Sequence, residues 1–267
     1  RGAWVLRVEE TAREQAAAAV TEFESEERSR PRAPVLEPLK IPKLAVLVTL
    51  VAMVVFHRLQ LIAPPPLIAR GVAADDAIRA GEWWRIFTAL TLHGDVEHLV
   101  SNMSLAVFVF AFVLWRFGVG AGLLGTILGG AMGNLLNAFA HVAKSHHSIG
   151  SSTALFASLG LLAGGELASR LMHRATRTGW HLLVPLGAGF AFLALFGGGR
   201  MNADGTPIRD AGRVDVMAHL FGLAAGVALG AIFFASGLRG GARRGLQVAC
   251  GTTAVVLLAV AWLLAAR

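Results

Sequence analysis

Seven long apolar segments limit what this chain can fold into. They run approximately over 43–62, 96–115, 120–141, 151–168, 180–197, 215–237 and 246–265. Each is close to the roughly 20 residues that an α-helix needs to cross a bilayer. Backbone polar groups within lipid must be satisfied inside the spanning segment, so runs of this length are expected to be helices. We therefore predict an all-α, polytopic membrane protein that has the lipid bilayer as its immediate partner.

Composition and charge agree with this class and argue against nucleic-acid binding. Of the 267 residues, 55% are hydrophobic and only 15% are charged, although the formal net charge is +7. The Lys and Arg residues fall in short loops between the apolar runs, the distribution that orients membrane helices. The densest clusters lie at 1–43, 170–177 and 239–244. Seven spans place all three on one side, which predicts a cytoplasmic N-terminus and a C-terminus outside.

The chain divides by composition into three parts. Residues 1–42 are polar and mixed in charge, without the apolar core of a signal peptide, and we expect a cytoplasmic N-terminal extension. Residues 43–237 hold six spans, and 238–267 hold a loop and the seventh. Acidic residues near the N-terminus argue against an organelle transit peptide, which favours a bacterial plasma membrane.

A polar loop leads directly into the fourth span. It reads His147-Ser148-Ile149-Gly150-Ser151-Ser152 and is followed by an apolar helix. A serine at the start of a membrane helix, just after a glycine, can meet water and still lie below the membrane surface. Taken alone, this pattern is more typical of helix capping and close packing than of catalysis.

Two other spans carry polar residues that hydrocarbon tolerates only with partners or water. His98 and Asn102 lie one turn apart on one helix face, and His219 precedes Gly222 in a stripe of small residues that lets another helix approach. Each feature alone is compatible with helix packing. Together with the serine they supply a nucleophile, a base and oxyanion donors, which is a complete hydrolytic set.

These residues lie in motifs that resemble those of the rhomboid intramembrane serine proteases. In chain order the motifs are Glu82-Trp83-Trp84-Arg85, His98-x-x-x-Asn102, Gly150-x-Ser152 and Ala218-His219-x-x-Gly222. They occur in the family's order, within about 43–237. The resemblance implies a six-helix rhomboid-like core plus one C-terminal transmembrane helix, a 6+1 arrangement. Taken singly, Trp83 and Trp84 are expected to be interfacial anchors.

The resemblance also implies an activity, the cleavage of transmembrane segments of other membrane proteins. Ser152 would be the nucleophile and His219 its base, in a dyad without an acidic third member. The oxyanion would be held by His98, Asn102 and the backbone N–H of Ser152. No cofactor and no metal is implied.

Three further residues are implied to support the dyad. They are Gly150 in the turn, Gly222 on the histidine helix, and Phe156, which would stack on the imidazole where the family often has tyrosine. Thr153 departs from the family, since glycine is usual directly after the nucleophile. Threonine is compatible with the turn if its dihedral angles are helical.

Other polar residues near these motifs are expected to be structural. Asp215, one turn before His219, is interpreted as a solvated or capping residue and not as a third catalytic member. His141, His146 and His147 are expected to face solvent, because no carboxylate or cysteine nearby completes a metal site. Cys250 is expected to pack within the seventh span.

Two other functions are compatible with parts of the pattern. A catalytically inactive relative would bind membrane clients without cutting them, and Thr153 is the only feature that favours it. A multi-span transporter predicts internal repeats with interrupted spans in matching halves, and the sequence contains no such duplication.

Overall fold

The computed structural model describes residues 7–29, 40–62, 66–140, 146–172, 215–238 and 244–267, together with Gly187 and Ala191. Contacts divide the chain into two units, 1–39 and 40–267. In the first unit a 3-10 turn, η1 (Glu10–Ala12), leads into the polar, mostly exposed helix α1 (Arg13–Ser29).

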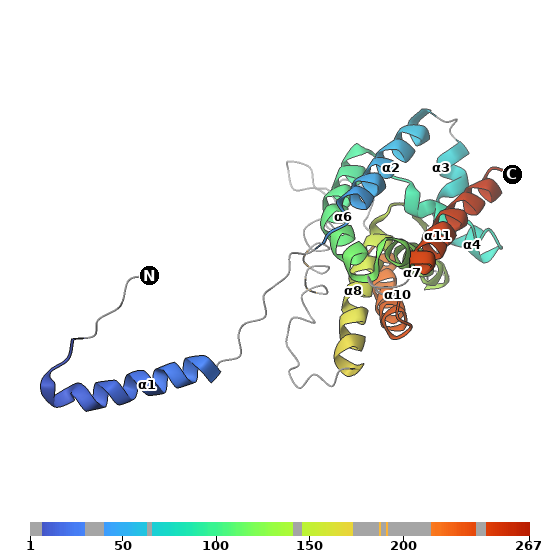
Figure 1. Cartoon of the computed structure of the whole chain (residues 1–267). Coiled ribbons are helices and arrows are strands. Elements are labelled where there is room, and N and C mark those ends of the chain that lie inside the picture. Colours follow the sequence, from blue (N-terminus) through green and yellow to red (C-terminus); the bar gives the residue numbers. More distant parts are fainter. Residues whose placement is uncertain are drawn as a thin grey trace. The chain divides into compact units, whose positions relative to one another are not determined.

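Six helices in the described part of the second unit are long and apolar enough to cross a membrane (Figure 1). They are α2 (Lys43–Ile62), α6 (Val96–Phe117), α7 (Val119–Ala140), α8 (Ser152–Met172), α10 (Val216–Ala235) and α11 (Arg244–Ala265). The predicted all-α, polytopic architecture is confirmed, and these helices end within about one turn of the expected bounds. The span predicted at 180–197 lies outside the described residues, apart from Gly187 and Ala191, so the count of seven stays a prediction.

Helices α8 and α10 lie backbone against backbone, because glycines remove side chains from both faces of their contact. Gly160 and Gly164 on α8 face carbonyl oxygens of α10, and Gly226 and Gly230 on α10 face carbonyl oxygens of α8. A Cβ added at any of the four positions would overlap the opposite backbone. Small residues are the usual means by which membrane helices reach such separations. Helix α7 packs on both of them and completes the centre of the core.

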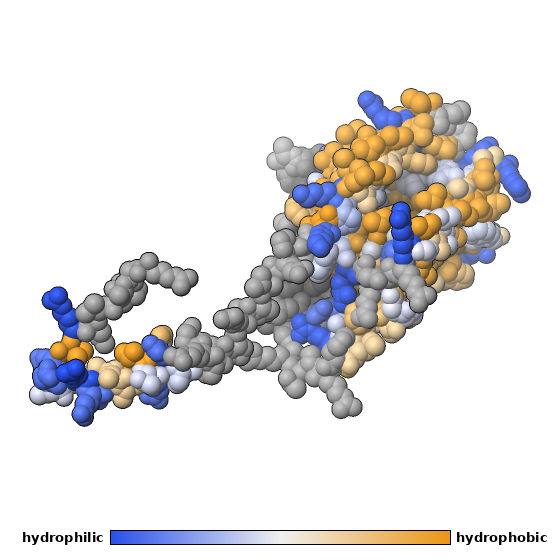
Figure 2. Space-filling model, viewed as in Figure 1, coloured by the Kyte–Doolittle hydropathy of each residue, from blue (hydrophilic) through white to orange (hydrophobic). Residues whose placement is uncertain are grey.

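The remaining spans lie around this centre. Helix α2 packs on α6, and α11 packs on α7 (Figure 1). Their outer faces leave large apolar side chains exposed, among them Leu44 on α2 and Val255 and Leu263 on α11. Figure 2 shows apolar residues gathered over the outer surface of this part of the molecule. Such a surface is stable against lipid and would be unusual in water.

The segment between α2 and α6 is folded into short elements, and we call it the α2–α6 connection. They are α3 (Pro66–Gly71), β1 (Ala73–Ala74), α4 (Asp75–Arg79), α5 (Arg85–Thr88) and η2 (Ala89–Thr91). Strand β1 pairs in antiparallel fashion with β2 (His147–Ser148), which lies just before α8. The connection is thereby attached to the turn that precedes Ser152.

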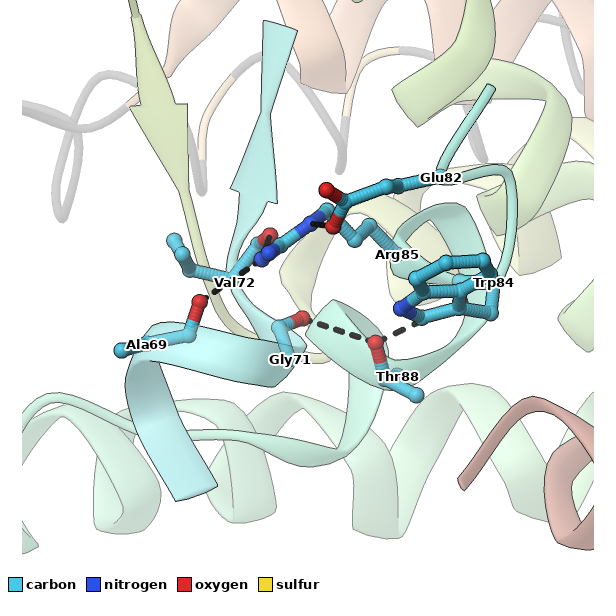
Figure 3. Close-up of polar contacts among 7 residues, drawn as sticks. All are labelled: Ala69, Gly71, Val72, Glu82, Trp84, Arg85 and Thr88. Atoms are coloured by element: carbon cyan, nitrogen blue, oxygen red, sulfur yellow. Dashed lines mark hydrogen bonds and ion pairs between the residues drawn. The ribbon is translucent and has the colours of Figure 1, made fainter. Parts of the chain in front are cut away.

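Side-chain hydrogen bonds to backbone carbonyls hold the connection together (Figure 3). Arg85 donates to the carbonyls of Ala69 and Val72, at 2.8 and 3.0 Å, and pairs with Glu82 at 2.7 Å. The two tryptophans of the motif differ in their surroundings. Trp83 is exposed, as an interfacial anchor requires, whereas Trp84 packs against the buried cluster that contains Ala131 and Ile86, so the expected anchoring role fits Trp83 alone.

The contact between α8 and α10 yields a testable prediction. Gly226→Ala should lower the melting temperature in detergent, because the new methyl meets the carbonyl of Ala157 and overpacking typically costs about 1–3 kcal/mol. Gly245→Ala on α11 is the matched control, since nothing lies within 4 Å of its added Cβ. A Gly226→Ala protein as stable as Gly245→Ala would contradict the packing described.

Candidate active site

Ser152 is the first residue of α8 and follows a turn that only glycine makes without strain. Gly150 has φ = +126°, and its N–H donates to the carbonyl of Ala89 in the connection at 3.0 Å. The first N–H groups of a helix have no partner within that helix, and Ser152 contributes one of them. The turn therefore presents a hydroxyl and a free backbone donor at the same place.

The close approach of α8 and α10 brings Ser152 and His219 together. The Ser152 Oγ and His219 Nε2 atoms lie 2.7 Å apart. His219 is 5% exposed, and its ring is stacked on that of Phe156 with centroids 4.5 Å apart and planes 10° from parallel. Phe156 lies one turn after Ser152 on α8, so a single helix supplies both the hydroxyl and the surface that orients the imidazole. With Nε2 unprotonated, the hydroxyl donates to it.

The other ring nitrogen of His219, Nδ1, is buried and has no hydrogen-bond partner in the described part of the chain. The carboxylate of Asp215 is engaged elsewhere, because its Oδ1 accepts from the N–H of Ala218 at 3.0 Å and caps α10. The expectation that Asp215 caps a helix is therefore confirmed.

Asp215 also binds two side chains from other elements. Its Oδ2 accepts from Asn137 Nδ2 at 2.6 Å and lies 2.7 Å from His146 Nε2. The expectation that His146 faces solvent is wrong, because this partner holds its ring against the end of α10. His147 is exposed as expected, and His141 lies outside the described residues.

These contacts decide the charge of Asp215. Burial acts to raise the pKa of its carboxyl, but the hydrogen bonds from Ala218 and His146 and the nearby imidazoles outweigh burial and lower the pKa below its ordinary value. Asp215 is therefore a carboxylate at neutral pH.

His98 approaches the same turn from α6, and Asn102 follows it one turn later on the same helix. A Cβ added at Gly150 would lie 2.7 Å from His98 Nε2 and 3.5 Å from Ser152 Oγ, so both groups converge on this glycine. His98 Nδ1 accepts from the N–H of Gly94 at 3.4 Å, which leaves Nε2 to carry the ring proton as a donor. Asn102 is 3% exposed, and its Nδ2 has no partner among the described residues.

A second serine–histidine contact lies beside the first and was not anticipated. Ser151 Oγ is 3.2 Å from Nε2 of His93, a fully buried ring whose centroid is 5.4 Å from that of His98. Burial, followed by the neighbouring rings of His98 and His57, lowers the pKa of His93 to about 3, so this imidazole is uncharged at neutral pH.

The His93 backbone is fixed by Gln60 of α2. The Gln60 amide donates to the His93 carbonyl at 2.6 Å and accepts from its N–H at 3.1 Å. One sequence feature could have predicted this buried polar cluster. His57 and Gln60 share one face of an apolar helix and therefore require a polar neighbour.

Thr153 does not crowd the turn. It lies inside α8, is 2% exposed, and directs its methyl group between Gly133 of α7 and Gly222 of α10. A Cβ at Gly133 would lie 2.7 Å from that methyl, and a Cβ at Gly222 would lie 2.5 Å from the Thr153 carbonyl oxygen. Two glycines thus make room for the side chain that the family usually lacks.

The Asp215 contacts predict a pH-dependent contribution to stability. Asp215→Ala should lower the free energy of unfolding at neutral pH by about 1–3 kcal/mol, because buried donors lose their acceptor. The pKa of Asp215 is lowered in the folded protein, so its contribution is complete above the ordinary value of 3.8 and is lost as pH falls through the lowered value. Melting temperatures of parent and variant, measured at neutral and strongly acidic pH, should converge in acid. The exposed Glu14→Ala is the control, and a gap independent of pH would contradict the assignment.

Comparisons with known proteins agree with the motifs. Residues 80–236 match the sequence profile of the Rhomboid domain. The chain is 32% identical over 127 residues to rhomboid protease GluP of Bacillus subtilis, which covers 47% of this chain and 24% of that protein. It is 30% identical over 177 residues to RHOMBOID-like protein 1 of Arabidopsis thaliana, with 65% and 41% covered. RHOMBOID-like protein 9, chloroplastic, from the same plant is 36% identical over 91 residues, with 34% and 20% covered.

The matched regions span less than half the length of each of these relatives. The Rhomboid match nevertheless extends from just after α4 to the end of α10 and covers more than half of this chain, including Ser152 and His219. The chain therefore belongs to the rhomboid family of multi-pass membrane proteins.

Proposed function

We propose that this protein is an intramembrane serine endopeptidase that cleaves transmembrane segments of membrane proteins through a Ser152–His219 dyad. The observation that carries the proposal is the 2.7 Å contact between the Ser152 hydroxyl and the buried His219 imidazole. A serine hydroxyl is a weak nucleophile until an adjacent base accepts its proton, and this contact supplies the base. The relative from Bacillus subtilis is itself named a rhomboid protease.

The first step follows from the positions of the two groups. Ser152 Oγ attacks the peptide carbonyl carbon while its proton passes to His219 Nε2. The resulting imidazolium returns that proton to the leaving amine as the C–N bond breaks, which leaves an acyl group on Ser152. A water molecule then releases the acyl group, again with His219 as the base. Stacking on Phe156 keeps the ring plane fixed through both proton transfers.

The oxyanion would form on the side of Ser152 that His98 approaches, with three proposed donors. These are the Nε2–H of His98, the Nδ2–H of Asn102 and the backbone N–H of Ser152. Because Asn102 Nδ2 has no partner in the described residues, its hydrogen bond would be made only when charge develops on the substrate. Removing one such donor typically lowers turnover by about 10²–10³-fold.

The substrate class follows from where the dyad lies. Peptide bonds in a transmembrane helix are hydrogen-bonded and shielded, so the segment to be cut must unwind before Ser152 can attack. Glycine, proline or other weak helix formers near the scissile bond should therefore favour cleavage. We further propose a bacterial plasma membrane, because the acidic N-terminal residues argue against a transit peptide, and a cytoplasmic N-terminus with the C-terminus outside, from the distribution of Lys and Arg.

The proposal predicts the outcome of a cleavage assay. Purified protein in liposomes should cut a single-span reporter within its transmembrane segment, and Ser152→Ala or His219→Ala should each abolish product. Ser104→Ala is the control, because the hydroxyl of this exposed serine of α6 donates to the carbonyl of Val100 in its own helix. Products are identified by mass spectrometry.

Two results would contradict the proposal. Cleavage retained by folded Ser152→Ala would exclude this nucleophile. A folded parent inert towards reporters with and without helix-breaking residues would instead favour a relative that binds membrane clients without cutting them.

A further inference from the structure

The C-terminal helix α11 contacts the α2–α6 connection through one residue near its end. The indole N–H of Trp262 donates to Thr91 Oγ1 at 3.1 Å. Its ring packs against Phe56 of α2, with centroids 5.2 Å apart, and covers Gly71, where an added Cβ would lie 2.6 Å from the indole. Trp262 thus joins α2, α3 and η2 at one point, far from Thr91 in sequence.

Thr91 belongs to a short series of hydrogen bonds inside the connection. Its hydroxyl donates to the carbonyl of Thr88 at 2.8 Å. The Thr88 hydroxyl in turn donates to the carbonyl of Gly71 at 2.8 Å, as Figure 3 shows. Leu92, which is fully buried, and His93 follow directly. The indole therefore fixes the backbone immediately before the imidazole that contacts Ser151 and the ring of His98.

The other end of α11 is fixed to the turn between α6 and α7. Gln247 Nε2 donates to the carbonyl of Phe117 at 2.8 Å, and its Oε1 accepts from the N–H of Ala121 at 3.1 Å. A Cβ at Gly120 would overlap the backbone of Gln247, so the helices are in direct backbone contact there. Helix α11 is held at both ends and cannot shift along α7 without breaking one set of these bonds.

We propose that α11 is a brace that fixes the α2–α6 connection, and that Trp262 is a positioning residue for the oxyanion side of the site. The role in catalysis rests on the proposed protease function. Loss of the indole contact frees the backbone at 88–93, and His93 and His98 then lose their alignment with the turn at Gly150. Displacements of about 1 Å far from the chemistry are known to reduce turnover by about 10²-fold.

The test uses the full chain and three substitutions. Trp262→Phe keeps an aromatic ring against Gly71 and loses the N–H, Trp262→Ala removes both, and Thr91→Val removes the acceptor. Leu263→Ala is the matched control, because this neighbouring side chain is 67% exposed. Amide hydrogen exchange over 88–93 measures how firmly the backbone of the connection is held. The kcat and KM for cleavage of the reporter measure the effect on catalysis.

We expect exchange over 88–93 to accelerate by about tenfold or more in Trp262→Ala and to remain unchanged in Leu263→Ala. Turnover should fall roughly three- to tenfold in Trp262→Phe, the effect of one hydrogen bond, with KM little changed. Thr91→Val combined with Trp262→Phe should lose no more than the larger single effect, because both changes remove the same bond.

Three outcomes would overturn the inference. They are unchanged exchange in Trp262→Ala, an equal loss of turnover in Leu263→Ala, or additive effects of Thr91→Val and Trp262→Phe. If the parent cuts no reporter, the protease proposal fails separately, and hydrogen exchange still decides whether α11 fixes the connection. If Trp262→Ala does not fold, turnover and hydrogen exchange of Trp262→Phe still test whether the indole contact fixes the connection.

Discussion

The close approach of α8 and α10 is the constraint on which the site depends. Glycines on both helices bring backbone against backbone, and this separation allows the Ser152 hydroxyl to reach the His219 ring at 2.7 Å. The same approach places Thr153 between Gly133 and Gly222. These glycines leave the space that the threonine side chain needs at a position where the family usually has glycine. Small residues therefore determine the chemistry here as much as the polar ones do.

The surroundings of each polar group give neighbouring residues different roles. Ser152 contacts His219, whereas the adjacent Ser151 contacts His93, which is uncharged and fixed through Gln60. Two adjacent serines thereby contact different histidines, Ser152 the imidazole of α10 and Ser151 a buried polar cluster. A buried donor such as Asn102 Nδ2, which has no partner among the residues that the structure describes, is costly in a folded core and calls for an explanation such as a functional role.

The spans and the motif residues could be read from the sequence because they rest on local patterns: apolar length, helical spacing and short motifs. The features that the sequence does not predict depend on contacts between segments that are far apart in the chain. The pairing of His146 with Asp215, the partnership of His93 with Ser151, and the anchoring of Trp262 on Thr91 join residues that no periodicity relates. The sequence identifies α11 only as a further apolar span. Its contacts with the α2–α6 connection become visible only in the folded structure.

The most direct test of the account is to map the adduct of a serine-directed fluorophosphonate on the purified protein. Peptide mass spectrometry distinguishes the two adjacent serines. We expect modification of Ser152 that requires His219, with Ser151 unmodified. An adduct on Ser151, or modification of Ser152 that persists in folded His219→Ala at the parent rate, would contradict the central claim that α8 and α10 together activate Ser152.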